Sequence, residues 1–199
     1  AIRGLPVASG GAKFLQIQED GLPILQFGDI AFGNADIFLR IDSTVQTIES
    51  IRGGSASTAA SNAPGGILNI ISKTGDTDSG SVSATVGLDY DTYRTDFEYG
   101  TDINDTLRFH IGGFVRTGEG PREAGYTANK GGQIKANITK EFDSGYVRLH
   151  FKHLDDKSIG YLPMPMYSDG GSLPGFDSSS DTTQSAYFLS TLSLGADGQ

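Results

Sequence analysis

The stretch from Ser81 to Gly100, "SVSATVGLDYDTYRTDFEYG", alternates between apolar and polar residues on both sides of a central turn. A period of two residues is that of a β-strand, whose successive side chains point to opposite faces. A turn at Asp91–Thr92 would place Val86 opposite Phe97 on the apolar face. The stretch therefore predicts an antiparallel hairpin with one apolar and one polar face.

The same alternation is repeated further along the chain. A turn at 103–105 leads from this hairpin into "TLRFHIGGFV", and a turn at 143–145 joins "QIKANITKEF" to "YVRLHFKHL". A sixth run of similar length, "SAYFLSTLSL", alternates less cleanly. The second part of the chain is therefore expected to contain about six antiparallel strands.

The connections between these strands alternate in length. The turns at 103–105 and 143–145 are short, whereas the connections at 117–131 and 155–184 are long. Transmembrane β-barrels of outer membranes have short turns on one rim and long loops on the other. The residues predicted to face lipid are Val86, Phe97, Ile111 and Leu149.

A soluble β-sandwich, such as a carbohydrate-binding module, is the alternative. Alternating strands also build sandwiches, whose apolar face is a core and whose polar face meets water. The basic residues on the polar faces suit a water-filled lumen, and the long loops exceed those of a small sandwich. These basic residues are Arg94, Arg108, Lys135, Arg148 and Lys152.

The composition narrows the classes of function. The 199 residues carry a formal net charge of −9 and no cysteine, and the acidic residues are scattered. This charge argues against nucleic-acid binding through phosphate neutralisation. The histidines at 110, 150 and 153 lack metal-site spacing, and no acid–base or nucleophile motif is present. We therefore expect no enzyme activity, no cofactor and no metal site.

A second informative stretch, "IESIRGGSASTAASNAPGGILNIISK", runs from Ile48 to Lys73. It resembles the end of the plug domain of TonB-dependent outer-membrane receptors. That segment reads Val/Ile-Glu-x-Ile-x-Arg-Gly, then small residues, then Gly-Gly-x-Ile-Asn-Ile and a basic residue. "IRG" at Ile2–Gly4 and "FLQIQEDGLPI" at Phe14–Ile24 resemble the plug's Arg-Gly segment and its strand with an Asp-Gly turn. Gly65 and Gly66 are predicted to serve a special backbone conformation or a close approach.

The resemblance implies a mostly β fold in two parts. Residues 1–79 would be the second half of a plug domain, which is a small α+β unit. Residues 80–199 would be the first strands of an antiparallel transmembrane β-barrel, which in the family has about 22 strands. Because six strands cannot close a membrane barrel, we expect the chain to be a fragment.

The resemblance also implies a location and a function. The receptor would lie in the outer membrane of a Gram-negative bacterium and take up a scarce solute, such as a siderophore–iron complex or an oligosaccharide. Its partners would be membrane lipid, the small solute and the TonB–ExbB–ExbD energising complex, which would act through a segment not present here. Nucleic acid is not an expected partner.

Candidate site residues follow from loop positions and from the resemblance. Glu49 and Arg52 are predicted to make plug–barrel contacts. The acidic side chains of the loop at 155–184 should repel a strongly anionic ferric catecholate, so we expect a neutral ligand, an oligosaccharide or a hydroxamate-type ferric complex. The candidate ligand-binding residues are Arg3, Phe27, Phe32, Asn34, Tyr161, Met164, Met166 and Tyr167.

Overall fold

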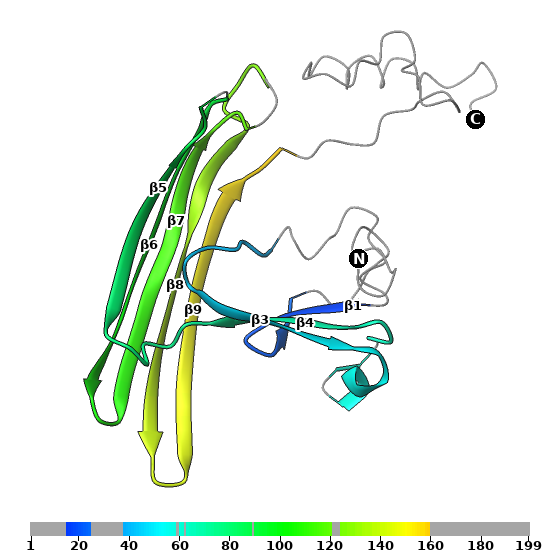
Figure 1. Cartoon of the computed structure of the whole chain (residues 1–199), viewed down its shortest axis with the longest axis vertical. Coiled ribbons are helices and arrows are strands. Elements are labelled where there is room, and N and C mark those ends of the chain that lie inside the picture. Colours follow the sequence, from blue (N-terminus) through cyan, green and yellow to red (C-terminus); the bar gives the residue numbers. More distant parts are fainter. Residues whose placement is uncertain are drawn as a thin grey trace, which may run out of the picture. The chain divides into compact units, whose positions relative to one another are not determined.

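The computed structural model describes residues 15–24, 38–58, 60, 61, 63–88, 90–120 and 124–159. Within these ranges the regular elements are strands and one 3-10 helix (Figure 1). The early elements are β1 (Leu15–Glu19), β2 (Leu22–Pro23), β3 (Val45–Arg52), η3 (Gly53–Thr58) and β4 (Gly66–Ser72). The later strands are β5 (Ser79–Val86), β6 (Thr92–Asn104), β7 (Leu107–Gly118), β8 (Asn129–Phe142) and β9 (Gly145–Lys157). No helix among the described residues has the length and apolar character needed to span a membrane.

The strands form two sheets, ordered β2-β1-β4-β3 and β5-β6-β7-β8-β9. By contacts, the chain divides into two compact units. The first unit contains residues 1–83, 96–114 and 133–154, and the second contains 84–95, 115–132 and 155–199. The four-stranded sheet therefore shares its unit with the parts of β6 to β9 that lie next to the two short turns.

The β1–β2 hairpin is shaped by local turn chemistry. Asp20 and Gly21 connect its strands with φ angles of 52° and 83°. Two consecutive positive φ values are those of a type I′ turn, which favours Asp-Gly because glycine has no Cβ. The strand and Asp-Gly turn predicted within Phe14–Ile24 are confirmed.

In the four-stranded sheet, β4 pairs with β1 in parallel and with β3 antiparallel. Gly66, opposite Arg52 in this pairing, has a φ of 137°, and a Cβ on it would lie 2.4 Å from the Ile51 carbonyl oxygen. The prediction that Gly66 serves backbone geometry and close approach is confirmed. The core of the sheet is built on Ala63 and Ile67, packed by Ile51 and Ala60. The α-helical part of the expected plug has no counterpart among the described residues.

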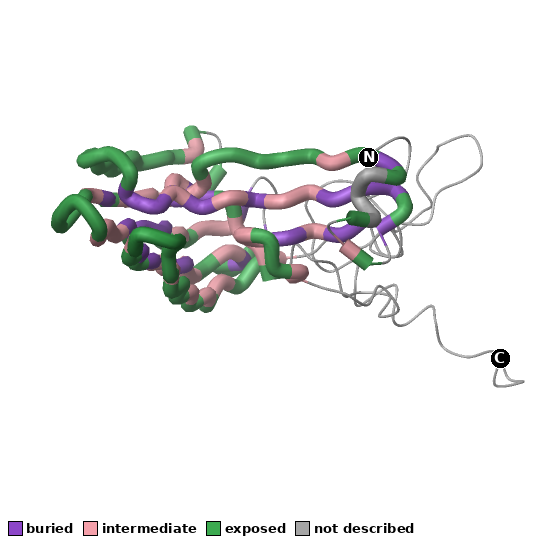
Figure 2. Tube along the Cα trace, turned by 90° about the horizontal axis from the view of Figure 1, so that it is seen from below, coloured by how far each residue is buried: buried purple, intermediate pink, exposed green. Residues whose placement is uncertain are grey.

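The five-stranded sheet has the reverse distribution of burial. On β8, the polar Lys135 is 7% exposed, whereas the apolar Ile138, on the opposite face of the strand, is 40% exposed. On β9, Leu149 is 66% exposed. The alternation of buried and less buried positions can be followed along the strands in Figure 2. The buried polar side chains of β7 and β8 are His110, Gln133, Lys135, Asn137 and Thr139.

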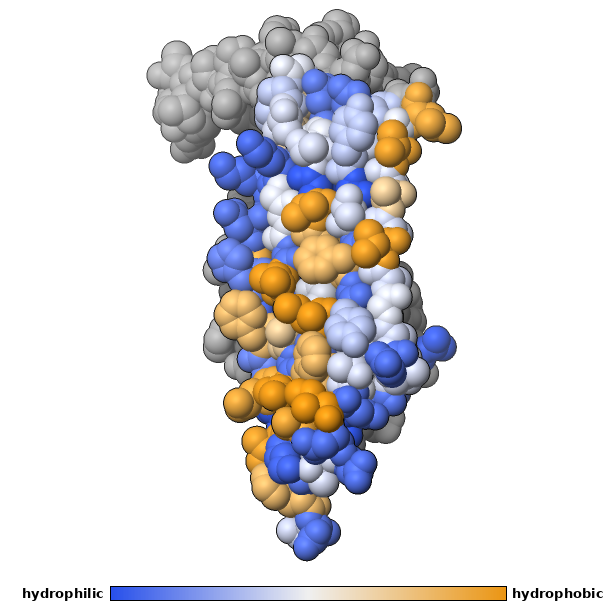
Figure 3. All heavy atoms as spheres, turned by 90° about the vertical axis from the view of Figure 1, so that its left-hand side faces the viewer, coloured by the Kyte–Doolittle hydropathy of each residue, from blue (hydrophilic) through white to orange (hydrophobic). Residues whose placement is uncertain are grey.

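The exposed face of this sheet is apolar, and Figure 3 shows hydrophobic side chains gathered on it. In the first unit the exposed residues include Tyr99, Ile111, Ile138, Val147, Leu149 and Phe151. In the second unit they include Val86, Tyr93 and Val115. A soluble sandwich would bury such a face as its core, so the sandwich alternative does not fit the observed burial.

The predicted register of the first hairpin is wrong, although its faces are right. Gly87 N–H donates to the Thr92 carbonyl (2.8 Å), and Ser81 Oγ–H donates to Glu98 Oε1 (3.1 Å). Val86 consequently lies opposite Tyr93 and not opposite Phe97. Because the shift is an even number of residues, each side chain keeps its face.

The other hairpin predictions hold more closely. The turn between β6 and β7 follows Asn104, and the turn between β8 and β9 follows Phe142. The rings of Tyr99 on β6 and Phe109 on β7 contact edge to face with centroids 6.0 Å apart. The sixth predicted run, at 185–194, lies outside the described residues.

Candidate functional site

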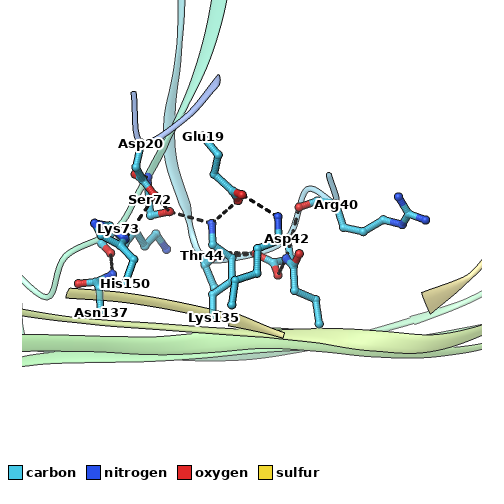
Figure 4. A network of polar contacts seen from close by, with 12 residues as sticks. Glu19, Asp20, Arg40, Asp42, Thr44, Ser72, Lys73, Lys135, Asn137 and His150 are labelled. Atoms are coloured by element: carbon cyan, nitrogen blue, oxygen red, sulfur yellow. Dashed lines mark hydrogen bonds and ion pairs between the residues drawn. The ribbon is translucent and has the colours of Figure 1, made fainter. Parts of the chain in front are cut away.

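The buried polar face of β6 to β9 meets the ends of β1 and β4 and the segment before β3, all within the first unit. Figure 4 shows part of this network. We call this network of contacts the polar interface. The residues on the side of the four-stranded sheet are Glu19, Asp20, Asp42, Thr44, Ser72, Lys73 and Asp76. The residues on β6 to β9 are Glu98, Arg108, His110, Gln133, Lys135, Asn137, His150 and Lys152.

Glu19, the last residue of β1, lies between two lysines. Lys135 Nζ on β8 is 2.8 Å from Glu19 Oε1, and Lys152 Nζ on β9 donates to Glu19 Oε2 at 2.6 Å. Lys152 also donates to the Phe38 carbonyl at 3.0 Å. Since Lys135 is buried, its charge needs this carboxylate. One carboxylate thus joins β1 to both β8 and β9.

Asp20 fixes the hairpin turn to the end of β4. The backbone N–H and the hydroxyl of Ser72 each donate to the Asp20 carboxylate at 2.8 Å. The same hydroxyl accepts a hydrogen bond from Lys135 Nζ at 2.7 Å. On β9, His150 Nδ1 lies 3.5 Å from Asp20 Oδ2. The turn is therefore held by polar contacts with β4 and β9, and Ser72 links it to β8.

Glu98 on β6 is the second carboxylate that joins several elements. Lys73 Nζ, just after β4, lies 2.6 Å from Glu98 Oε1, and His110 Nε2 on β7 lies 2.9 Å from Glu98 Oε2. The side chains of Glu98 and His110 are only 8% and 4% exposed. These contacts connect the end of β4 to β6 and β7.

Alternate inward residues of β8 contact successive parts of the four-stranded sheet and its approach. Gln133 Nε2 donates to Asp42 Oδ2 (2.7 Å), and Asn137 Nδ2 donates to the Lys73 carbonyl (2.8 Å). Asp42 in turn accepts from the backbone N–H and hydroxyl of Thr44. The remaining amide oxygens, Gln133 Oε1 and Asn137 Oδ1, are buried and make no hydrogen bond to another described residue.

The segment that follows β4 packs backbone to backbone on β7. Gly75 has a φ of 76°, and a Cβ on it would lie 2.0 Å from the Phe109 carbonyl oxygen. Next to it, Arg108 Nε is 2.8 Å from Asp76 Oδ1, and the same guanidinium contacts Glu141 on β8. Only glycine fits the position of Gly75.

A cavity of about 370 Å³ lies between the β1–β2 hairpin and strands β8 and β9. Its polar lining residues are Glu19, Asp20, Thr44, Ser72, His110, Lys135, Asn137, His150 and Lys152. Its apolar lining residues are Leu22, Pro23, Ile24, Phe38, Ala136 and Phe151. The unpaired Asn137 Oδ1 borders a space that is polar enough to hold water.

Similar proteins were found by the comparison with solved structures. No protein-family model matches the sequence, and no curated protein sequence matches it. The chain is similar to the pyoverdine outer membrane receptor FpvA from Pseudomonas aeruginosa PAO1 bound to pyoverdine. The TM-score is 0.56 and the identity 15%, over 69% of this chain and 20% of FpvA. The described strands therefore share the fold of a part of this receptor.

Two further receptors show weaker similarity. The siderophore receptor PirA from Acinetobacter baumannii gives a TM-score of 0.49 at 21% identity, over 69% of this chain and 23% of PirA. A variant of the ferric enterobactin receptor PfeA from Pseudomonas aeruginosa, in complex with enterobactin, gives 0.45 at 18% identity, over 70% of this chain and 25% of PfeA. The chain thus spans about a fifth to a quarter of the length of these siderophore receptors.

The contacts of the polar interface hold the four-stranded sheet and strands β6 to β9 together within the first unit. Glu19, Asp20 and Glu98 are each held by two or more donors. Among the described residues, no three His, Asp or Glu side chains are grouped as metal ligands. The contacts range from the buried pair of Glu98 and His110 to the partly exposed pair of Glu19 and Lys152.

The structure brings together residues that differ from those predicted for this role. Glu49 and Arg52 lie on β3, at the edge of the four-stranded sheet, and both are exposed. Their plug–barrel contact stays a prediction. The predicted ligand-binding residues Arg3, Phe27, Phe32, Asn34, Tyr161, Met164, Met166 and Tyr167 lie outside the described residues.

Sequence reasoning missed Glu19 as the main contact of the interface. Lys135 and Lys152 were expected on the polar face, but Glu19 precedes Lys152 by 133 positions. A single sequence carries no signal for a pairing at that distance. The Asp-Gly turn beside Glu19 was the one local sequence signal, and it indicated a hairpin at this point of the chain.

Proposed function

We propose that the chain is part of a TonB-dependent receptor of the bacterial outer membrane. Residues 1–79 would belong to its plug and residues 80–199 to its barrel. The observation that carries the proposal is the reversed burial of the five-stranded sheet, with Lys135 buried and Leu149 exposed. A sheet with an apolar outer face and a polar inner face is the pattern of a membrane barrel. The shared fold with FpvA supports the same assignment.

The polar interface supports the assignment of the four-stranded sheet to a plug. A plug fills a wide lumen and has to separate from the wall when solute passes. Ion pairs such as those of Glu19 and Glu98 hold it in place, and their charges become hydrated once the lumen opens to water. An apolar interface of the same area would resist separation much more strongly.

For the solute we propose a siderophore–iron complex. FpvA is bound to pyoverdine and the PfeA variant to enterobactin, which makes this class the first to test. The predicted ligand-binding residues from Arg3 to Asn34 and from Tyr161 to Tyr167 remain the candidates for contact. Uptake would draw energy from the TonB–ExbB–ExbD complex, and the protein would act as a transporter and not as an enzyme.

The test uses the full-length receptor in a Gram-negative host that lacks its own siderophore receptors. Outer-membrane fractions are probed for the protein, and uptake of radioactive iron is measured with pyoverdine, enterobactin and a hydroxamate siderophore. We expect outer-membrane localisation and uptake that stops when the proton gradient is dissipated. Recovery of the protein in a soluble fraction, or uptake that persists without the gradient, would contradict the proposal. If the receptor binds oligosaccharides and none of the siderophores, the proposed solute class changes from siderophore–iron complexes to oligosaccharides.

A further inference from the structure

The four-stranded sheet contacts β6 to β9 in two different ways. After the end of β4 the contact combines the ion pair of Lys73 with Glu98 and close backbone packing. A Cβ on Gly75 would lie 2.0 Å from the Phe109 carbonyl oxygen, and one on Gly100 would lie 3.0 Å from Gly75 Cα. At the β1–β2 hairpin the contact is made by charged side chains of Glu19 and Asp20. The first contact therefore includes close backbone packing, whereas the second is made by side chains.

The cavity lies at the second of these contacts. Glu19, Asp20 and Leu22 of the hairpin region line one side, and Lys135 and Lys152 line the other. Its volume of about 370 Å³ is at the lower end of the range of about 300–1,000 Å³ for ligand pockets. A siderophore–iron complex would need a wider opening at this place.

We infer that the solute passage opens between the β1–β2 hairpin and strands β8 and β9, with the segment at 73–76 as the pivot. Glu19 leaves Lys135 and Lys152, and Asp20 leaves His150, so that the cavity widens while Gly75 stays packed on β7. This inference rests on the proposed uptake function and adds to it the wall along which the solute moves.

The energetics favour this site of opening. The side chains of Glu19 and Lys152 are 15% and 26% exposed, so both charges gain hydration on release. The buried Lys135 has to be hydrated in the widened cavity, which offsets part of this gain. The apolar core on Ile67 lies inside the four-stranded sheet and is not broken by a pivot. The pairing of β1 with β4 is also preserved, because the hairpin moves with its sheet. The hydrogen bond from Gln133 to Asp42 is a further tie that must open.

The test bridges the interface at each of its two ends in the full-length receptor. One double variant carries Glu19→Cys and Lys152→Cys, and the matched control carries Lys73→Cys and Glu98→Cys. Both replace a Lys–Glu contact of 2.6 Å, and the 199 residues contain no other cysteine. A short bismaleimide joins each pair. Uptake and surface binding of iron-loaded pyoverdine or enterobactin, whichever wild type takes up, are measured before and after bridging.

We expect the bridge between positions 19 and 152 to abolish uptake while surface binding is retained. The bridge between positions 73 and 98 should leave the uptake of its own unbridged variant unchanged. Continued uptake with positions 19 and 152 bridged would overturn the inference, as would an equal loss from both bridges. A wild type that takes up none of the probes overturns the proposed uptake itself, which separates the two failures.

Discussion

In the four-stranded sheet Ile67 is fully buried, whereas in the five-stranded sheet Leu149 is 66% exposed and Lys135 is buried. Both sheets are built from alternating strands, so their local patterns are of one kind. They differ in what lies on each side, since one sheet packs its apolar residues on itself and the other turns them outward. The comparison shows that alternation defines the two faces of a strand but not which face meets the core.

The largest expected effect comes from breaking the junction between the two sheets. Gly75→Ala forces a Cβ against the Phe109 carbonyl oxygen at a φ of 76°, so we expect the four-stranded sheet to lose its place on β7. Gly21→Ala is the matched control, because Gly21 has a φ of 83° but no atom within 4 Å of a Cβ. It should cost only the left-handed strain of about 1–2 kcal/mol. Limited proteolysis of the full-length receptor distinguishes them, and equal protease resistance would refute the close-packing argument.

The next effect compares the two apolar environments directly. Ile67→Ala removes a fully buried side chain and should lower the free energy of unfolding by about 2–5 kcal/mol. Ile138→Ala, on the exposed face, should cost much less in detergent, where a flexible apolar solvent refills the space. Denaturant unfolding of the detergent-solubilised receptor gives both values. A larger loss for Ile138→Ala would mean that its face is packed against protein.

The outward face can also be tested with a charge. Leu149→Arg should destabilise the barrel by about 2–4 kcal/mol if position 149 lies near the bilayer midplane. His150→Arg, one residue later, faces inward and can still meet Asp20, so assembly should be nearly normal. Heat-modifiable electrophoretic mobility of outer-membrane fractions reports assembly. If both variants assemble equally well, the assignment of the outward face to lipid fails.

The smallest expected effect concerns the charged contacts at the β1–β2 hairpin. A double-mutant cycle of Glu19→Gln and Lys135→Met should give a coupling of about 0.5–3 kcal/mol. Lys152, which remains close to position 19 throughout, should keep the coupling in the lower part of that range. Unfolding in detergent supplies the four free energies. A coupling of zero would show that Lys135 is held by Ser72 and not by Glu19.

The faces and approximate ends of the strands could be predicted from the sequence. The face on which a residue lies depends only on whether its position along the strand is odd or even, which is a local property. The register could not, as the first hairpin shows, where Val86 lies opposite Tyr93 instead of Phe97. If one strand is shifted along the other by an even number of residues, apolar residues still lie opposite apolar residues. The alternation is therefore compatible with several registers. The turn at Gly87 and the close approach of Gly80 to Tyr99 select one of them.

The contacts of the polar interface could not be predicted from the sequence, for a different reason. Its contacts join residues distant in the chain, such as Glu19 with Lys152 and Asp42 with Gln133. A lysine on the polar face of a strand has the same local pattern whether its partner is water or a carboxylate. The resemblance of the stretch at 48–73 to a plug indicated that an interface would exist, but not which residues would form it.

The connector between the two sheets, residues 73–78, limits how far the four-stranded sheet can move away from β5. β4 ends at Ser72 and β5 begins at Ser79, so the four-stranded sheet is covalently tied to the first strand of the other sheet. Even fully extended, such a segment reaches only about 20 Å. With Gly75 held on β7, the length free to extend is shorter still. The four-stranded sheet can therefore turn about this tie, but it cannot be drawn far from the strand that follows it.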